Sequence, residues 1–115
     1  MTYEQMKRTV RSQLKEVLKT RDAGQKEYAH DKDNVFANFE RCASLLDIPR
    51  EKALMVYFLK HVDGISAHVK GHQSQREDVT GRITDAIVYL CLLRGMIEDG
   101  KNRSERNVVR SVLRM

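Results

Sequence analysis

The chain has 115 residues, and its 41% hydrophobic content, single Pro and six Gly are typical of one helical domain with a small core rather than a loop-rich or β-rich protein. Its 21 basic and 16 acidic residues give a net charge of +5, which favours anionic partners such as nucleotides or nucleic acid. The basic excess concentrates over residues 7–21 and 101–114, where it indicates either a solvated helix face or an anion-binding surface.

The cysteines and the apolar runs argue against a secreted or membrane-spanning protein. Cys42 and Cys91 form neither a disulfide framework nor a complete set of zinc ligands, so we expect buried free thiols. Residues 1–20 are charged and amphipathic, unlike a signal peptide. Arg94 interrupts the longest apolar run, which is too short to span a bilayer. We therefore expect a protein of the reducing cytoplasm without membrane contact.

A first amphipathic helix is predicted near the start of the chain, because apolar residues recur at steps of three and four. These residues are Met6, Val10, Leu14, Val17 and Leu18. Thr2 and Gln5 have the spacing of a capping box at the helix start. The pattern weakens near Ala23 and Gly24, and the polar connector "QKEYAHDKDN" follows.

A second helix is predicted over residues 34–46. Its expected inner face consists of Val35, Phe36, Phe39, Cys42, Ala43 and Leu46. Lys26 and Tyr28 in the connector, and Asn38 at the start of this helix, stand where backbone N–H groups favour anions. They are candidates for binding a phosphate or a similar group, and the alternative is an ordinary capped connector.

A third helix is predicted over residues 50–70, because Pro49 suits the first helical position and Gly71 suits the cap at the end. Its buried residues are expected to be Leu54, Met55, Phe58, Leu59, Val62 and Ile65. Lys60 is flanked by apolar residues, and it either reaches a phosphate or lies in solvent.

Three histidines align along this third segment, namely His61, His68 and His72. Only His68 and His72 are close enough in sequence to share one metal ion, and Gly71 is expected to end the helix between them. The histidines are therefore not expected to form a metal site.

A fourth helix is predicted over residues 76–98, with its end at Gly100. A basic tail follows over residues 101–115, in which "NVVRSVLRM" fits a short last helix. No stretch alternates between polar and apolar residues for long enough to predict a strand. We therefore expect an all-α bundle of four to five helices, with one helical domain over residues 1–100 and the tail attached to it.

Ionisable side chains lie on the core-facing stripe of the fourth helix. At about 100° per residue, Asp78, Arg82, Asp85 and Tyr89 fall within a band about 60° wide, and Glu77 lies beside it. Because an unpaired buried charge is costly, these carboxylates should be paired or should hold a cation. One interpretation is a structural network in which Arg82 pairs with Asp78 and Asp85. The other is a polar pocket that binds phosphate or a metal, with Glu77, Asp78 and Asp85 as metal ligands.

Several short motifs occur in a recognisable order. A Lys-Glu-Tyr connector leads to Asn-Phe in "NVFANF", a Lys lies within the apolar helix "VYFLKHVDGI", and Glu77 is followed by Asp-x-x-x-Tyr in "DAIVY". Together they resemble the nucleotide modification associated domain 1 family of phages and bacteria, which is similar to the all-α nucleoside triphosphate pyrophosphohydrolases of the MazG type. The resemblance covers roughly residues 20–98, so the basic tail lies outside it.

The resemblance implies a MazG-like fold, a homo-oligomer and a role in nucleotide metabolism during phage infection, in the cytoplasm of the host. By the same match, the site positions are Tyr28, Asn38, Lys60, Glu77 and Asp85. Binding of a nucleotide or a nucleotide-like small molecule is the function that follows from this resemblance.

Two versions of this function stay open. In the catalytic version, Glu77 and Asp85 hold Mg²⁺ and activate water for attack on a phosphoanhydride, while Lys60 and Arg82 steady the phosphates. In the binding version, the pocket captures a nucleotide signal without cleaving it, as a phage anti-defence protein would do. The magnesium signature is incomplete, because the chain contains no Glu-x-x-Glu or Glu-x-x-Asp and has Gly81 where the family usually has an acidic residue.

The alternative function belongs to another class, that of a small helical interaction protein. Such a protein would bind a host protein or a nucleic acid through its basic ends. The tail has five basic residues and no aromatic residue, which favours contact with a phosphate backbone over stacking on bases.

Overall fold

The computed structural model describes residues 1–26, 33–73 and 77–115. These residues form four helices and no strand, in the order α1 (Tyr3–Gly24), α2 (Ala37–Leu46), α3 (Arg50–Val69) and α4 (Val79–Arg114). The predicted all-α fold is confirmed. None of the helices in the described ranges is long and apolar enough to cross a membrane.

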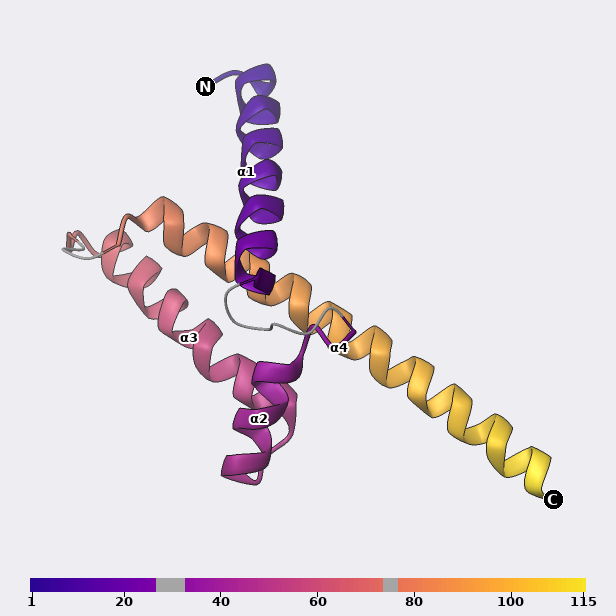
Figure 1. The fold of residues 1–115 in the computed structure, drawn as a ribbon. Coiled ribbons are helices and arrows are strands. Elements are labelled where there is room, and N and C mark those ends of the chain that lie inside the picture. Colours follow the sequence, from indigo (N-terminus) through magenta and orange to yellow (C-terminus); the bar gives the residue numbers. More distant parts are fainter. Residues whose placement is uncertain (27–32, 74–76) are drawn as a thin grey trace.

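The helices form a loose arrangement around the first half of α4 (Figure 1). α3 packs against both α2 and α4, whereas α1 makes its close helix contact with α4 alone. α1 stands away from the α2–α3 pair, and the second half of α4 projects beyond the other helices (Figure 1). The molecule is therefore elongated, with principal extents of 61 × 36 × 26 Å.

The first helix begins at the predicted capping box. The Thr2 hydroxyl accepts a hydrogen bond from the Gln5 backbone N–H at 3.1 Å, and the Gln5 side-chain oxygen accepts one from the Thr2 backbone N–H at 2.7 Å. The predicted inner face of this helix is largely exposed, since Val17 is its one buried apolar residue among those described. The exposed part of this predicted face consists of Met6, Val10, Leu14 and Leu18.

The core lies where α2, α3 and α4 meet. Leu54 and Met96 are completely buried, and Phe36 and Phe39 complete the central cluster. The prediction for α2 is therefore confirmed at Phe36 and Phe39, but wrong at Leu46, which is 61% exposed. A ten-residue α2 offers room for only one buried stripe, and Leu46 is its last residue.

One arginine that the sequence pattern did not single out joins three helices. Arg50, at the start of α3, donates to a Glu40 carboxylate oxygen on α2 and to an Asp99 carboxylate oxygen on α4, each at 2.9 Å. It also donates to the Met96 carbonyl at 3.3 Å and lies 4.8 Å from the centre of the Phe36 ring. Its side chain is 10% exposed, so the guanidinium is part of the core.

The predicted end of the fourth helix at Gly100 is wrong, because α4 continues to Arg114. Glycine within a helix costs only about 1 kcal/mol relative to alanine, and no proline follows it. Ion pairs across the glycine support the helix, with Arg103 Nε 3.4 Å from Asp99 Oδ2 and Lys101 Nζ 3.9 Å from Glu98 Oε1. The predicted short last helix is thus the exposed end of a longer one.

The ends of α3 agree with the prediction within one residue. Pro49 is the N-cap residue rather than the first helical residue, and Gly71 follows the helix with a φ of +96°. Leu54 is buried as predicted, but Leu59 is 50% exposed. One side of α3 therefore faces solvent where the apolar pattern predicted a core.

Candidate functional site

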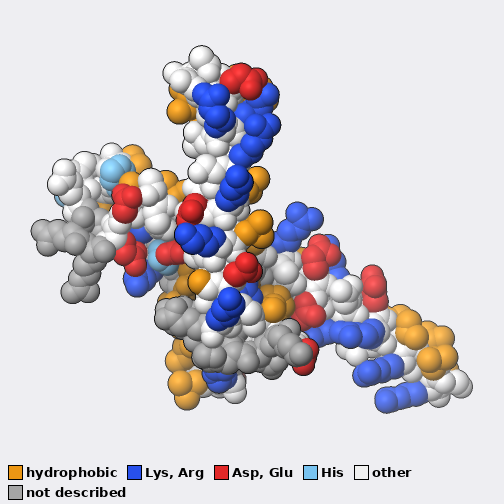
Figure 2. Space-filling model, turned by 45° about the horizontal axis from the view of Figure 1, so that its top comes forward, with side chains coloured by type: hydrophobic (Ala, Val, Ile, Leu, Met, Phe, Trp, Pro, Cys, Tyr) orange, Lys and Arg blue, Asp and Glu red, His pale blue; other side chains and the backbone are white. Residues whose placement is uncertain are grey.

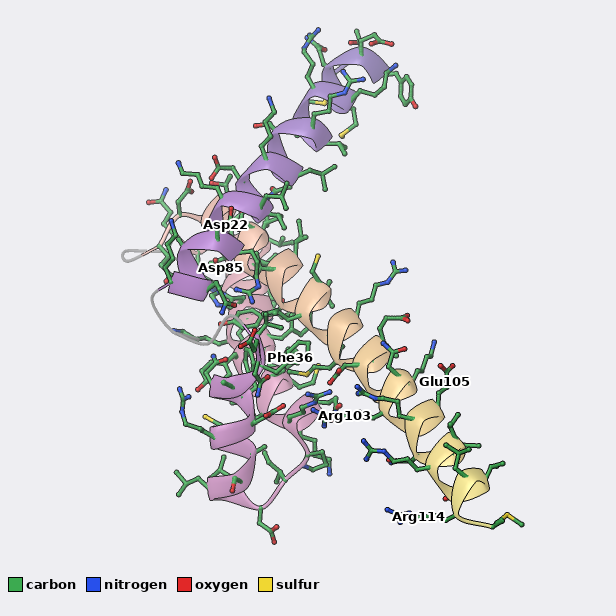
Figure 3. The ribbon with its side chains drawn as sticks, turned by 45° about the vertical axis from the view of Figure 1, so that its right-hand side comes forward. Asp22, Phe36, Asp85, Arg103, Glu105 and Arg114 are labelled. Atoms are coloured by element: carbon green, nitrogen blue, oxygen red, sulfur yellow. The ribbon has the colours of Figure 1, made fainter. Side chains whose placement is uncertain are left out.

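A groove of about 810 Å³ lies between the end of α1 and the facing sides of α2, α3 and α4. Four of the residues predicted for a site line it, namely Asn38, Lys60, Glu77 and Asp85. These residues come from α2, α3, the segment before α4, and α4 itself. Figure 3 shows Asp85 where the end of α1 crosses α4. The fold thus brings together side chains that are far apart in the sequence.

One wall of the groove is aromatic. The Tyr57 and Tyr89 rings are stacked with centroids 6.2 Å apart, and Phe39 meets both edge-on, at 5.8 Å and 6.2 Å. The Cys42 sulfur lies 3.4 Å from the Tyr57 hydroxyl, and this hydrogen bond, together with burial, raises the pKa of Tyr57. Tyr89 was predicted as part of the stripe on the fourth helix, whereas no role was predicted for Tyr57. Tyr57 lies four residues before His61, and this spacing places both side chains on the same face of α3. That spacing was the signal that could have identified Tyr57.

The polar end of the groove contains one histidine and two carboxylates. His61, Glu77 and Asp85 each place a ligand atom within 4.8 Å of the others. The His61 ring stacks on Tyr89 at 5.5 Å, and its Nδ1 lies 3.9 Å from Asp85 Oδ2. His61 is only 6% exposed, and Nδ1 has no hydrogen-bond partner among the residues that the structure describes.

Burial raises the pKa of the Asp85 carboxyl above its ordinary value. The nearby negative charge of Glu77 acts in the same direction, while the interactions with His61, Arg82 and Lys60 act against it. An ionised Asp85 is therefore held in the groove at a cost in free energy, which a bound cation would offset.

The structure turns Arg82 away from the groove. Its side chain lies across the backbone of α3 at Gly64, where a Cβ atom would collide with it. Its ion pair is with Glu77, at 3.5 Å, rather than with Asp78 or Asp85 as the spacing predicted. The groove-lining residues do not include Arg82, so its predicted contact with phosphate receives no support from the geometry.

Two other predicted residues, Asp78 and Lys26, do not line the groove. Asp78 is the N-cap residue of α4, and its carboxylate accepts a hydrogen bond from the Thr80 hydroxyl. It is not part of the group formed by His61, Glu77 and Asp85. Lys26 is exposed beyond the end of α1, and Tyr28 lies outside the described residues.

Two arginines line the groove that the sequence pattern did not assign to a site. Arg21 belongs to the basic run of α1, which was interpreted as either a solvated helix face or an anion-binding surface, and Arg41 lies on α2. Arg21 also donates to the Gln25 side-chain oxygen at 2.6 Å. Together with Lys60, these side chains give the groove three cationic groups opposite its carboxylates.

No family model, curated protein or solved structure matches this chain. The site is therefore interpreted from its own residues and geometry.

Proposed function

We propose that the groove binds a nucleotide or a nucleotide-like small molecule. The observation that carries this proposal is the aromatic wall of Phe39, Tyr57 and Tyr89 beside a cluster of charged side chains in one groove. Aromatic faces stack on bases, with a gain of about 1–3 kcal/mol per base in nucleic-acid complexes. Such a groove suits a ligand with two parts, a base that stacks on the aromatic wall and a phosphate group that contacts the charged side chains.

The cationic side chains supply the second half of this recognition. Lys60, Arg21 and Arg41 line the groove and offer charge-assisted hydrogen bonds to phosphate oxygens. Asn38 is the second residue of α2, where the helix N-terminus favours negative charge, and its amide also suits the edge of a base. This arrangement supports the assignment of Asn38 and Lys60 that the sequence motifs implied.

Binding is the version of this function that the geometry supports best. Among the described residues, two carboxylates line the groove, those of Glu77 and Asp85, and a complete magnesium signature of the MazG type would supply more. A protein that captures a nucleotide signal needs no more than the groove itself. In the catalytic version, the same carboxylates would hold Mg²⁺ and activate a water molecule.

Thermal unfolding with a panel of nucleotides tests the proposal. We expect at least one mononucleotide or cyclic nucleotide, with or without Mg²⁺, to raise the Tm of the wild type. Asp85→Ala and Tyr89→Ala should lose this rise. Asp63→Ala, which removes an exposed carboxylate on α3 outside the groove, should keep it. If no nucleotide shifts the Tm of the wild type, the proposal is wrong.

A pyrophosphate-release assay then separates the two versions. Release from a bound triphosphate that depends on Mg²⁺ and on Glu77 would establish the catalytic version. Tight binding without release would establish capture.

A second candidate function rests on the two basic ends. Lys and Arg side chains follow α1 and the projecting end of α4, with apolar side chains between them (Figure 2). Such a surface suits a phosphate backbone or an acidic protein partner. Salt-dependent binding of duplex or single-stranded nucleic acid, reduced by Arg106→Glu and Arg110→Glu but not by Asp85→Ala, would support this candidate.

A further inference from the structure

We propose that His61, Glu77 and Asp85 form a binding site for a divalent transition-metal ion, such as Zn²⁺ or Mn²⁺. This inference deepens the function proposed for the groove, since it names the ion at its polar end. It rests on the groove but not on nucleotide binding, because the ion would bind these three side chains directly. His61 replaces Asp78 in the ligand set that the sequence pattern predicted.

The distances allow one ion to reach all three side chains. Three ligand atoms that lie within 4.8 Å of one another always fit inside a circle with a radius of about 2.8 Å. Zinc binds histidine nitrogen and carboxylate oxygen at about 2.0–2.2 Å, so the atoms need to close by less than about 1 Å each. The Glu77 side chain is 45% exposed and precedes the first residue of α4, so its rotamer can supply this closure.

The buried histidine is independent evidence for a ligand. The His61 side chain is 8% exposed, and its Nδ1 faces Asp85 at 3.9 Å, which is too long for a hydrogen bond. Nδ1 has no hydrogen-bond partner within the described part of the chain, although leaving a buried polar atom without one is unfavourable. Stacking on Tyr89 fixes the ring. An ion between His61 and Asp85 would satisfy both groups.

The donor set selects the class of ion. Mg²⁺ prefers oxygen ligands in a nearly octahedral shell, whereas an imidazole nitrogen with two carboxylates suits zinc, manganese or iron. Three protein ligands also leave a coordination position open, as in catalytic zinc sites. Because His61, Glu77 and Asp85 all line the groove, the open position would face the ligand that occupies it.

A titration of the full chain with Co²⁺ alone, without any nucleotide, tests this site. Co²⁺ takes the place of Zn²⁺ and gives weak visible absorption bands when bound by nitrogen and oxygen. We expect one ion per chain, and we expect His61→Gln, Glu77→Gln and Asp85→Asn each to weaken binding by about tenfold or more. His68→Gln and Asp63→Asn are matched controls on α3 and should bind as the wild type does. A thousandfold excess of Mg²⁺, roughly, should not displace the ion.

Two measurements distinguish the loss of metal binding from the loss of the fold. Circular dichroism checks each variant, and Glu77→Gln is the variant least able to disturb the fold, because Glu77 is exposed and lies outside the helices. In the wild type, diamagnetic Zn²⁺ should shift the NMR signals of the His61 ring and leave those of His68 in place.

Several outcomes would overturn the proposal. Binding that is unchanged in Glu77→Gln and His61→Gln would place the ion elsewhere, and intense near-ultraviolet absorption would indicate Cys42 as the ligand. Absence of Co²⁺ binding to the wild type would refute the site outright. If Co²⁺ binds these residues but no nucleotide shifts the Tm, the metal site stands and the nucleotide-binding function fails. If nucleotides bind without any Co²⁺ binding, the reverse holds.

Discussion

At the scale of single residues, Arg50 connects three helices through one side chain. Its guanidinium joins α2, α3 and α4 through two carboxylates, a carbonyl oxygen and the face of Phe36. Removing it leaves the partly buried carboxylates of Glu40 and Asp99 without their main partner.

We predict that Arg50→Ala lowers the free energy of unfolding by about 2–4 kcal/mol, because charged hydrogen bonds and core packing are lost together. Urea denaturation followed by circular dichroism measures this change. Arg50→Lys should recover only part of it, since an ammonium group cannot donate to both carboxylates in the same fork geometry. A loss below about 0.5 kcal/mol would be that of an ordinary surface residue and would contradict the role given to Arg50.

The same network predicts a dependence of stability on pH. The hydrogen bond from Arg50, with the nearby charges of Arg103 and Arg106, holds the pKa of Asp99 below its ordinary value. A carboxyl whose pKa is lowered on folding stabilises the protein at pH values above its unfolded pKa. This contribution is lost as the pH falls through the folded pKa.

We therefore expect Asp99→Asn to have a lower Tm than the wild type at neutral pH, with the difference shrinking once the pH falls below about 4. Thermal unfolding at several pH values checks this. Asp22→Asn, at an exposed position on α1, serves as the control and should show no such convergence. A difference in Tm between Asp99→Asn and the wild type that stays constant down to about pH 3 would refute this role of the Asp99 charge.

The residues of the groove show how far sequence reasoning reaches at this scale. Lys60 and Asp85 were identified because polar residues within apolar patterns need an explanation. Asn38 was identified from its position at a helix start, and Glu77 from its position beside the polar stripe of the fourth helix. His61 was not assigned, since a histidine in an apolar helix is ordinary until a carboxylate from another helix faces it. That pairing depends on how α3 and α4 cross, and the pattern of one helix does not contain this information.

At the scale of elements, the helix boundaries that carry a clear local signal followed the sequence most closely. The capping box of α1 and the Pro49 start of α3 are local signals, and both are confirmed. Gly71 ends α3 because its φ of +96° suits glycine, whereas Gly100 stays helical inside α4. A glycine alone therefore does not distinguish a helix end from a helix interior.

The start of α4 gives a prediction of its own. Gly81 is in the first turn of this helix, and a Cβ atom there would have no atom within 4 Å among its neighbours. Gly81→Ala should raise the free energy of unfolding by about 0.5–1 kcal/mol. Gly81→Glu should raise it less, because an acidic side chain suits a helix N-terminus but would lie beside the carboxylates of Glu77 and Asp85. Chemical denaturation measures both changes. A loss of stability in both variants would mean that another molecule packs against this turn.

At the scale of the whole molecule, two helices expose apolar side chains that no other described part of the chain covers. Met6, Val10, Leu14 and Leu18 form an exposed stripe on α1, and Val108, Val109, Val112 and Leu113 form another on α4. Contiguous apolar surface of this kind marks an interaction site in soluble proteins. The spacing of these residues on each helix was predictable from the sequence. The partner surface that covers them cannot be predicted from the apolar pattern of a single chain.

We predict that a second copy of the chain covers the α1 stripe, so that the protein is a homo-oligomer in solution. Light scattering coupled to size-exclusion chromatography should give a mass of at least twice 13.4 kDa. The double variant Leu14→Glu and Leu18→Glu should shift the protein toward the monomer, because it places charges in a buried apolar interface. Lys15→Glu, on the exposed charged face of the same helix, is the control. A wild type that stays monomeric at high concentration would contradict the prediction.

The unbroken course of α4 has a mechanical consequence. Its 36 residues, at a rise of about 1.5 Å each, make a rod about 54 Å long that begins beside the groove and ends in the basic surface at Arg114. Rotation of this rod by about 5° around its first turn would carry its last turn through roughly 5 Å. A ligand that tilts α4 by that amount would therefore move the C-terminal end of the helix. This displacement would be large enough to bind or release a partner there.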